Sequence, residues 1–175
     1  MDGKYSKSQI ILHWLVVILI VPQFLFSHKI SKALEARFNG YEVLESPLIS
    51  LHILTGFIIF CLACARFIQR LDNSNHREDN NINYVGKIIK HLNHYTLYFL
   101  LLALPITGAI GWFRGIEAFA NLHVMLKSIF LLLVALHLTS TLYQQLFLKN
   151  NVLGNMLLGR KLMLNSNFYV FHKFF

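Results

Sequence analysis

The chain alternates between long apolar stretches and short polar segments. Four apolar stretches are each near the length of about 20 residues that an α-helix needs to cross a bilayer. They cover residues 10–26, 48–68, 95–113 and 122–148. The remaining segments are too short to form a separate soluble domain. The pattern predicts an all-α integral membrane protein, a four-helix bundle that forms a single domain over residues 1–175.

Composition supports this prediction. Of the 175 residues, 55% are hydrophobic, which is more than an ordinary soluble domain contains. The first stretch also has features of a signal peptide, because Lys4 and Lys7 precede an apolar run. However, no small-residue cleavage site follows Val21, and His13 and Trp14 interrupt the run. We therefore expect this stretch to remain as a helix.

The net charge of +8 is distributed as membrane topology requires, which argues against a role in binding nucleic acid. Eleven basic and four acidic residues lie in the two tails and around the connection between the second and third stretches. The opposite loops carry four residues of each sign. Because cytoplasmic segments are enriched in Lys and Arg, both termini are predicted to be cytoplasmic.

The polar segments and the glycine and proline positions predict further structural features. Residues 27–47 are polar and predict an extracytoplasmic loop with a short amphipathic helix around residues 32–38, after which Pro47 begins the second membrane helix. In the third helix, Pro105 followed by Gly108 and Gly111 predicts a kink and a close approach of another backbone in the outer half. The C-terminal tail mixes apolar and basic residues, which is typical of a segment on the cytoplasmic membrane face.

Four of the nine histidines lie in or at the ends of the apolar stretches: His13, His52, His123 and His137. An ionisable side chain inside a membrane needs a partner or a bound group, so each of them calls for one. A single membrane histidine can equally be a hydrogen-bonded helix contact. The spacing separates the two interpretations, because His123 and His137 are 14 residues apart, close to four turns. They therefore share a helix face and lie about 21 Å apart along the axis.

Topology divides the four histidines into two pairs. His13 begins the first helix on the cytoplasmic side, and the descending fourth helix brings His137 to a similar depth. His52 and His123 both begin their helices on the outer side. Each pair could supply the two axial imidazoles of one haem, as a transmembrane electron path requires.

Other residues fit the same hypothesis. Arg66 follows His52 by 14 residues and could neutralise a haem propionate. Gly56 and Gly108 could leave room for a porphyrin, and His94 could form a hydrogen bond near the inner haem. Ordinary membrane anchoring by arginine and helix packing by glycine explain these residues equally well.

At these residues the chain resembles the bacterial cytochrome b561 family. The likeness spans about residues 4–160 and is carried by KYSKSQIILHWL, PLISLHILTG, CARFIQRL, HLNHYTLYFLLLALPITG and the histidine pair of the fourth helix. The resemblance implies two haem b groups with His13, His52, His123 and His137 as axial ligands. It also implies a multi-pass protein of the bacterial inner membrane that exchanges electrons with quinone.

Two features depart from the family pattern. The connection between the third and fourth helices is short, which puts any substrate contact there in doubt. Lys127, one turn after His123, places a positive charge beside the expected outer haem. It could attract an anionic reductant such as superoxide, whose oxidation by quinone is associated with the family. Pairing with a haem propionate is the favoured interpretation.

The sequence leaves three functions open. The leading hypothesis is a di-haem cytochrome that carries electrons across the membrane to or from quinone, with superoxide or a soluble protein as donor. The second is a haem-containing membrane anchor for a dehydrogenase or hydrogenase, and the third is a small histidine-lined proton or ion transporter. Cys61 and Cys64 are interpreted as packing residues, since Ala65 stands where covalent haem attachment needs histidine.

Overall fold

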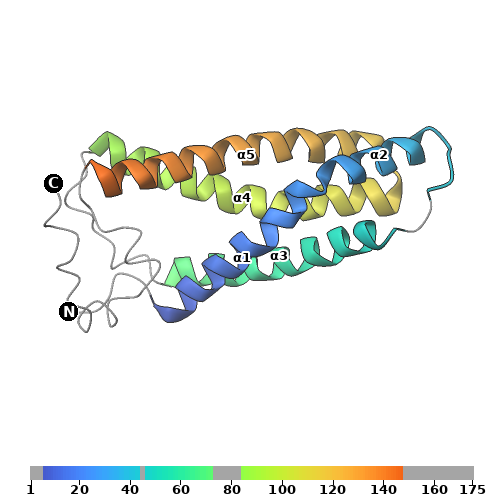
Figure 1. Ribbon diagram of the computed structural model, residues 1–175. Coiled ribbons are helices and arrows are strands. Elements are labelled where there is room, and N and C mark those ends of the chain that lie inside the picture. Colours follow the sequence, from blue (N-terminus) through green and yellow to red (C-terminus); the bar gives the residue numbers. More distant parts are fainter. Residues whose placement is uncertain (1–5, 44–45, 73–83, 148–175) are drawn as a thin grey trace, which may run out of the picture.

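The computed structural model describes residues 6–43, 46–72 and 84–147, and every regular element in these ranges is an α-helix. The helices are α1 (Lys7–Leu25), α2 (Ser27–Phe38), α3 (Pro47–Asp72), α4 (Tyr84–Arg114) and α5 (Glu117–Leu146) (Figure 1). Four of them, α1, α3, α4 and α5, are long and apolar enough to cross a membrane. The predictions of an all-helical protein and of four membrane spans are therefore confirmed.

Local signals in the sequence explain where the first and third helices begin. Ser6 forms a capping box with Gln9, in which each side chain accepts a hydrogen bond of 3.2 Å from the other residue's backbone N–H. Proline is favoured in a first helical turn, where its missing N–H costs nothing, and α3 begins at Pro47 as predicted.

The amphipathic helix predicted around residues 32–38 is present but longer than expected. It begins at Ser27 and is separated from α1 only by Phe26. Most of the segment predicted as an outer loop is therefore helical. Ile30 and Leu34 of α2 line the cavity described below.

The last two helices are joined very tightly. Only Gly115 and Ile116 separate α4 from α5, and Gly115 has a φ of 66°, a conformation that side chains rarely allow. At Gly111 an added Cβ would lie 2.9 Å from the backbone nitrogen of Ala120. The predicted close approach of another backbone in the third membrane helix is thus confirmed, and α4 continues as a helix through Pro105.

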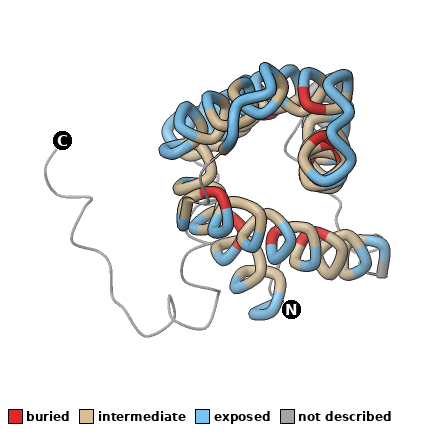
Figure 2. The backbone as a smooth tube through the Cα atoms, turned by 90° about the vertical axis from the view of Figure 1, so that its right-hand side faces the viewer, coloured by how far each residue is buried: buried red, intermediate tan, exposed pale blue. Residues whose placement is uncertain are grey.

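The packing of the bundle is typical of helices surrounded by lipid. α4 packs along α5, α3 contacts both α1 and α4, and α2 contacts α1. Few apolar side chains in the described ranges are fully buried, whereas many large ones are exposed along all four membrane helices (Figure 2). In water such exposure would be unfavourable, but in a membrane these apolar side chains contact apolar lipid tails.

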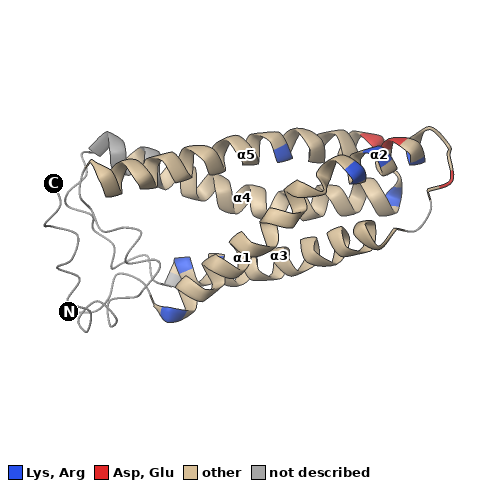
Figure 3. Cartoon of the chain, viewed as in Figure 1, with Lys and Arg blue, Asp and Glu red and all other residues tan. Residues whose placement is uncertain are grey.

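Charged residues lie mostly toward the ends of the described helices, and few lie in the middle of the bundle (Figure 3). This is the distribution expected when the middle lies in hydrocarbon. The C-terminal tail, which was predicted to lie on the membrane face, is outside the described residues. The polar segment at residues 73–83 is also outside them.

Candidate functional site

His52 of α3 and His123 of α5 lie opposite each other across the bundle. Their ring centroids are 6.4 Å apart and the ring planes are inclined by 78°. The sequence predicted that these two histidines share a level. The structure brings them together, and we refer to them below as the His52–His123 pair.

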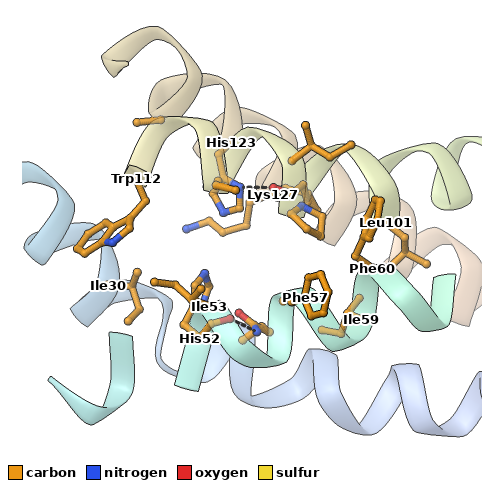
Figure 4. A pocket seen from close by; sticks show the side chains of 18 of the residues that line it. Ile30, His52, Ile53, Phe57, Ile59, Phe60, Leu101, Trp112, His123 and Lys127 are labelled. Carbon is orange, nitrogen blue, oxygen red and sulfur yellow. Dashed lines mark hydrogen bonds between the residues drawn. The ribbon is translucent and has the colours of Figure 1, made fainter. Parts of the chain in front are cut away.

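A backbone hydrogen bond fixes the orientation of the His123 ring. Its Nδ1 lies 2.8 Å from the carbonyl oxygen of Leu104 in α4 (Figure 4). A carbonyl can only accept, so Nδ1 carries the proton and the Nε2 lone pair is free for another partner. The buried Thr107 hydroxyl lies 3.5 Å from the same nitrogen.

Gly108 makes room for this ring. An added Cβ at Gly108 would lie 3.0 Å from Nδ1 and 3.1 Å from Cε1 of His123. The sequence led us to expect that Gly108 leaves space for a porphyrin. The nearest neighbour of this position is the imidazole of His123. Gly108 also lines the cavity described below, so its role in making space for a porphyrin stays a prediction.

A second set of hydrogen bonds supports the backbone at His52. The amide of Gln23 in α1 donates to the His52 carbonyl at 3.0 Å and also to the Thr55 hydroxyl. The His52 Nδ1 atom is buried and has no hydrogen-bond partner among the described residues. Such a buried polar atom costs free energy unless a ligand satisfies it.

The two imidazoles line a cavity of about 370 Å³. Its wall combines residues of all five helices and is almost wholly apolar, with Trp112 and residues of α2 at one end (Figure 4). Gly56 lies on this wall, and an added Cβ there would meet no atom within 4 Å. Lys127 also lines the cavity. The volume is in the range of small-molecule and cofactor sites.

A second histidine cluster lies on α1, α4 and α5. The rings of His137 in α5 and His94 in α4 are 5.1 Å apart and nearly perpendicular. His13 of α1 is close enough to interact electrostatically with His137 and with Arg66. The predicted partners His13 and His137 thus lie within electrostatic range of each other, and we refer to them as the His13–His137 pair.

Arg66 and its surroundings form a basic and aromatic cluster beside this second pair. The Arg66 guanidinium lies 5.8 Å from the centre of the Tyr98 ring, and Arg70 lies 5.2 Å from that of Tyr95. One terminal nitrogen of Arg66 is buried without a hydrogen-bond partner among the described residues. A carboxylate is the group that such a guanidinium binds best.

Sequence reasoning missed several supporting residues. Gln23 is the clearest case, since a lone amide at the end of an apolar stretch is a detectable signal. Arg70 lies four residues after Arg66 and shares its helix face. No local signal marks the Leu104 carbonyl, because only the packing of α4 on α5 brings it to His123.

Other candidate ligands do not extend these sites. Within the described residues, no group of three or more His, Cys, Asp or Glu side chains could hold a metal ion. Cys61 is exposed and Cys64 is half-buried, and both are free thiols. The geometry therefore offers paired imidazoles from facing membrane helices, an arrangement that suits a planar metal cofactor between them.

The fold and the paired histidines together define a class, that of helical membrane proteins with imidazole pairs inside the bundle. The chain belongs to the prokaryotic cytochrome b561 family, whose model matches residues 4–159. It is similar to cytochrome b562 of Cereibacter sphaeroides, with 26% identity over 163 residues that cover 91% of this chain and 98% of the relative. It is also similar to the probable superoxide oxidase CybB of Yersinia pestis, with 24% identity over 178 residues, 90% of this chain and 97% of the relative.

Family membership confirms the predicted resemblance and defines the general class of function. The chain is a membrane haem protein of the electron-transport type, with haem b as the cofactor that the family name implies. The family and the four apolar helices place it as a multi-pass protein of the bacterial inner membrane.

Proposed function

We propose that this protein is a di-haem cytochrome that carries electrons across the membrane and exchanges them with quinone. In this proposal the His52–His123 pair and the His13–His137 pair each supply the axial ligands of one haem b. Residues 1–175 act as one domain. The observation that carries the proposal is the facing arrangement of the His52 and His123 rings across an apolar cavity.

Three features support haem at the His52–His123 pair. A metal–imidazole bond is about 2 Å long, so ring centroids 6.4 Å apart leave space for one metal ion between the rings. The Leu104 carbonyl holds His123 in the tautomer whose Nε2 can bind a metal. The unpaired Nδ1 of His52 and the open space beside Gly56 fit a bound planar group.

Arg66 and His94 support haem at the His13–His137 pair. Arg66 is close enough to act electrostatically on both imidazoles, and its buried, unpaired nitrogen would be satisfied by a haem propionate. His94 packs against His137 and would restrict the rotation of that ring. The two histidine pairs would hold their haems at different depths in the membrane.

The side chains around the haem would determine how quinone approaches it. Haem would supply one-electron transfer, and two imidazoles of this chain bound to its iron would leave no position there for substrate. Quinone would therefore meet a haem edge and not bind iron. Apolar residues of α2 and α4 cover one end of the cavity and would limit the access of water there.

Superoxide is a candidate electron donor, because one relative is named a probable superoxide oxidase and Lys127 gives the cavity a positive charge. Each superoxide would lose one electron to become dioxygen. Two such electrons and two protons would convert one quinone to a quinol. A soluble electron-donor protein would deliver electrons in the same way.

Quinone exchange can be tested with purified protein that has been chemically reduced. Addition of a water-soluble quinone should reoxidise the haem, with one quinone consumed for every two haems. Superoxide generated by an enzymatic source should in turn reduce the oxidised protein, and superoxide dismutase should prevent this. Reduced haem that stays reduced in excess quinone would contradict the quinone link.

The charge distribution supports a topology with both termini in the cytoplasm. A green fluorescent protein fused to the C-terminus should therefore fluoresce in intact cells, whereas an alkaline phosphatase fusion at the same place should be inactive. The matched control is a fusion after Asn39, which follows α2 and should give the reverse result. An active phosphatase at the C-terminus would contradict this orientation.

Gly56 provides a test for a group inside the cavity. Since an added Cβ at this position meets no protein atom within 4 Å, the protein alone should accommodate Gly56→Leu. With haem bound, the leucine would compete for the same space, so we expect a lower content of haem at the His52–His123 pair, or none. Haem content is measured by the pyridine haemochrome spectrum, and unchanged content in this variant would mean that the porphyrin lies elsewhere.

A further inference from the structure

Lys127 is a cation placed deep inside a membrane helix. It lies ten residues after the start of α5 at Glu117, or about 15 Å along the axis, and the hydrocarbon core of a bilayer is about 30 Å thick. Lysine at such a depth is unfavourable and usually serves a function. Lys127 is half-buried, so it is not simply a side chain that faces lipid.

The side chain of Lys127 points into the cavity of the His52–His123 pair. Figure 4 shows it reaching into the space between the two imidazoles. Its charge acts electrostatically on both His52 and His123. Lys127 therefore acts on the bound group from the same side of the cavity as His123.

No carboxylate balances this charge within the cavity. Among the described residues that line it, Lys127 is the one charged side chain, and none is Asp or Glu. The surrounding wall is apolar, so water and counter-ions screen the charge weakly. A fixed positive charge in such surroundings has a strong effect on any change of charge nearby.

We propose that Lys127 raises the reduction potential at the His52–His123 pair. This inference rests on the proposed function, in which that pair binds haem. One-electron reduction adds one negative charge at the iron, and a neighbouring cation stabilises the reduced state relative to the oxidised state. Charge close to a redox centre is a recognised determinant of its potential.

The effect should be confined to one of the two pairs. Arg66 provides the cation that acts on His13 and His137, whereas Lys127 acts on His52 and His123. Each pair thus has a cation of its own. Removing Lys127 should lower the reduction potential at the His52–His123 pair and leave the potential at the His13–His137 pair unchanged.

The test is a spectroelectrochemical titration of the full-length haem-loaded protein. In Lys127→Met, an apolar side chain of similar length replaces the cation, and the midpoint potential of one haem should fall while the haem content stays unchanged. Lys127→Arg keeps the charge and should retain the potential of the wild type. The haem that shifts should be the one missing from His52→Ala. The control Arg114→Gln removes an exposed cation at the end of α4 and should shift neither potential.

Three results would overturn the proposal. Two unshifted potentials in Lys127→Met would show that the charge is too far away or too well screened. Equal shifts of both haems would show a general effect of net charge. Loss of one haem from Lys127→Met would make Lys127 an anchor for the cofactor. Wild-type protein without haem would refute the proposed function itself, which distinguishes that failure from a failure of Lys127 alone.

Discussion

Replacing His52 or His123 by alanine is expected to remove one and the same haem, so that about one haem per chain remains. Replacing His13 or His137 should remove the other haem. The reason is that an axial imidazole supplies a direct bond to the iron, and the facing helix cannot replace it. Haem per protein, combined with the reduced absorbance spectrum of each variant, measures both the loss and its grouping.

Histidines outside the two pairs provide the matched control. His28 of α2 and His91 of α4 also belong to described helices, and His28→Ala and His91→Ala should keep both haems. A double variant of one pair, His52→Ala with His123→Ala, should lose no more than either single variant. If the four losses grouped in any other way, the proposed pairing would be wrong.

Gly108→Leu is expected to remove the haem of the His52–His123 pair without changing a ligand. The first carbon of the new side chain would already lie 3.0 Å from His123 Nδ1, so the rest of the leucine should push the ring away from its hydrogen bond to the Leu104 carbonyl. Displacing the ring by about 1 Å would move Nε2 out of bonding range of the iron. Gly108→Ala should cause a smaller loss, because only the Cβ is added.

The other haem serves as an internal control for folding of the Gly108 variants. If the bundle stays intact, the haem of the His13–His137 pair remains at about one per chain. Ala118→Leu adds three carbons, one fewer than Gly108→Leu, at an exposed position in the first turn of α5 and should keep both haems. Full haem content in Gly108→Leu would show that the orientation of His123 is not required.

The sequence was sufficient to predict the membrane helices and the meeting of His52 with His123, but not the ring contact of His94 with His137. Apolar runs of membrane length have few alternative structures, because every backbone polar group in lipid must be satisfied internally. The spacing of 14 residues in α5 then placed His123 and His137 on one face. Helix periodicity and topology were therefore enough to predict that His52 meets His123, which the structure shows directly.

The sequence was less informative about contacts made between helices. The role of Gly108 as space for the His123 ring, and the hydrogen bond from Gln23 to the His52 backbone, depend on how α4 meets α5 and α1 meets α3. Helix periodicity predicts which residues share a face but not the distance between helices or their rotation. The early start of α2 at Ser27 was missed for a related reason, since a polar segment has no apolar run to mark a helix.

The most direct test of the central proposal is the absorbance spectrum of the purified wild-type protein, with haem measured per chain. Paired imidazole ligation at two depths predicts a reduced α band of b-type haem, about two haems per chain, and no change on exposure to carbon monoxide. Protein that is colourless after expression with ample iron and haem, or whose reduced spectrum shifts strongly with carbon monoxide, would contradict it.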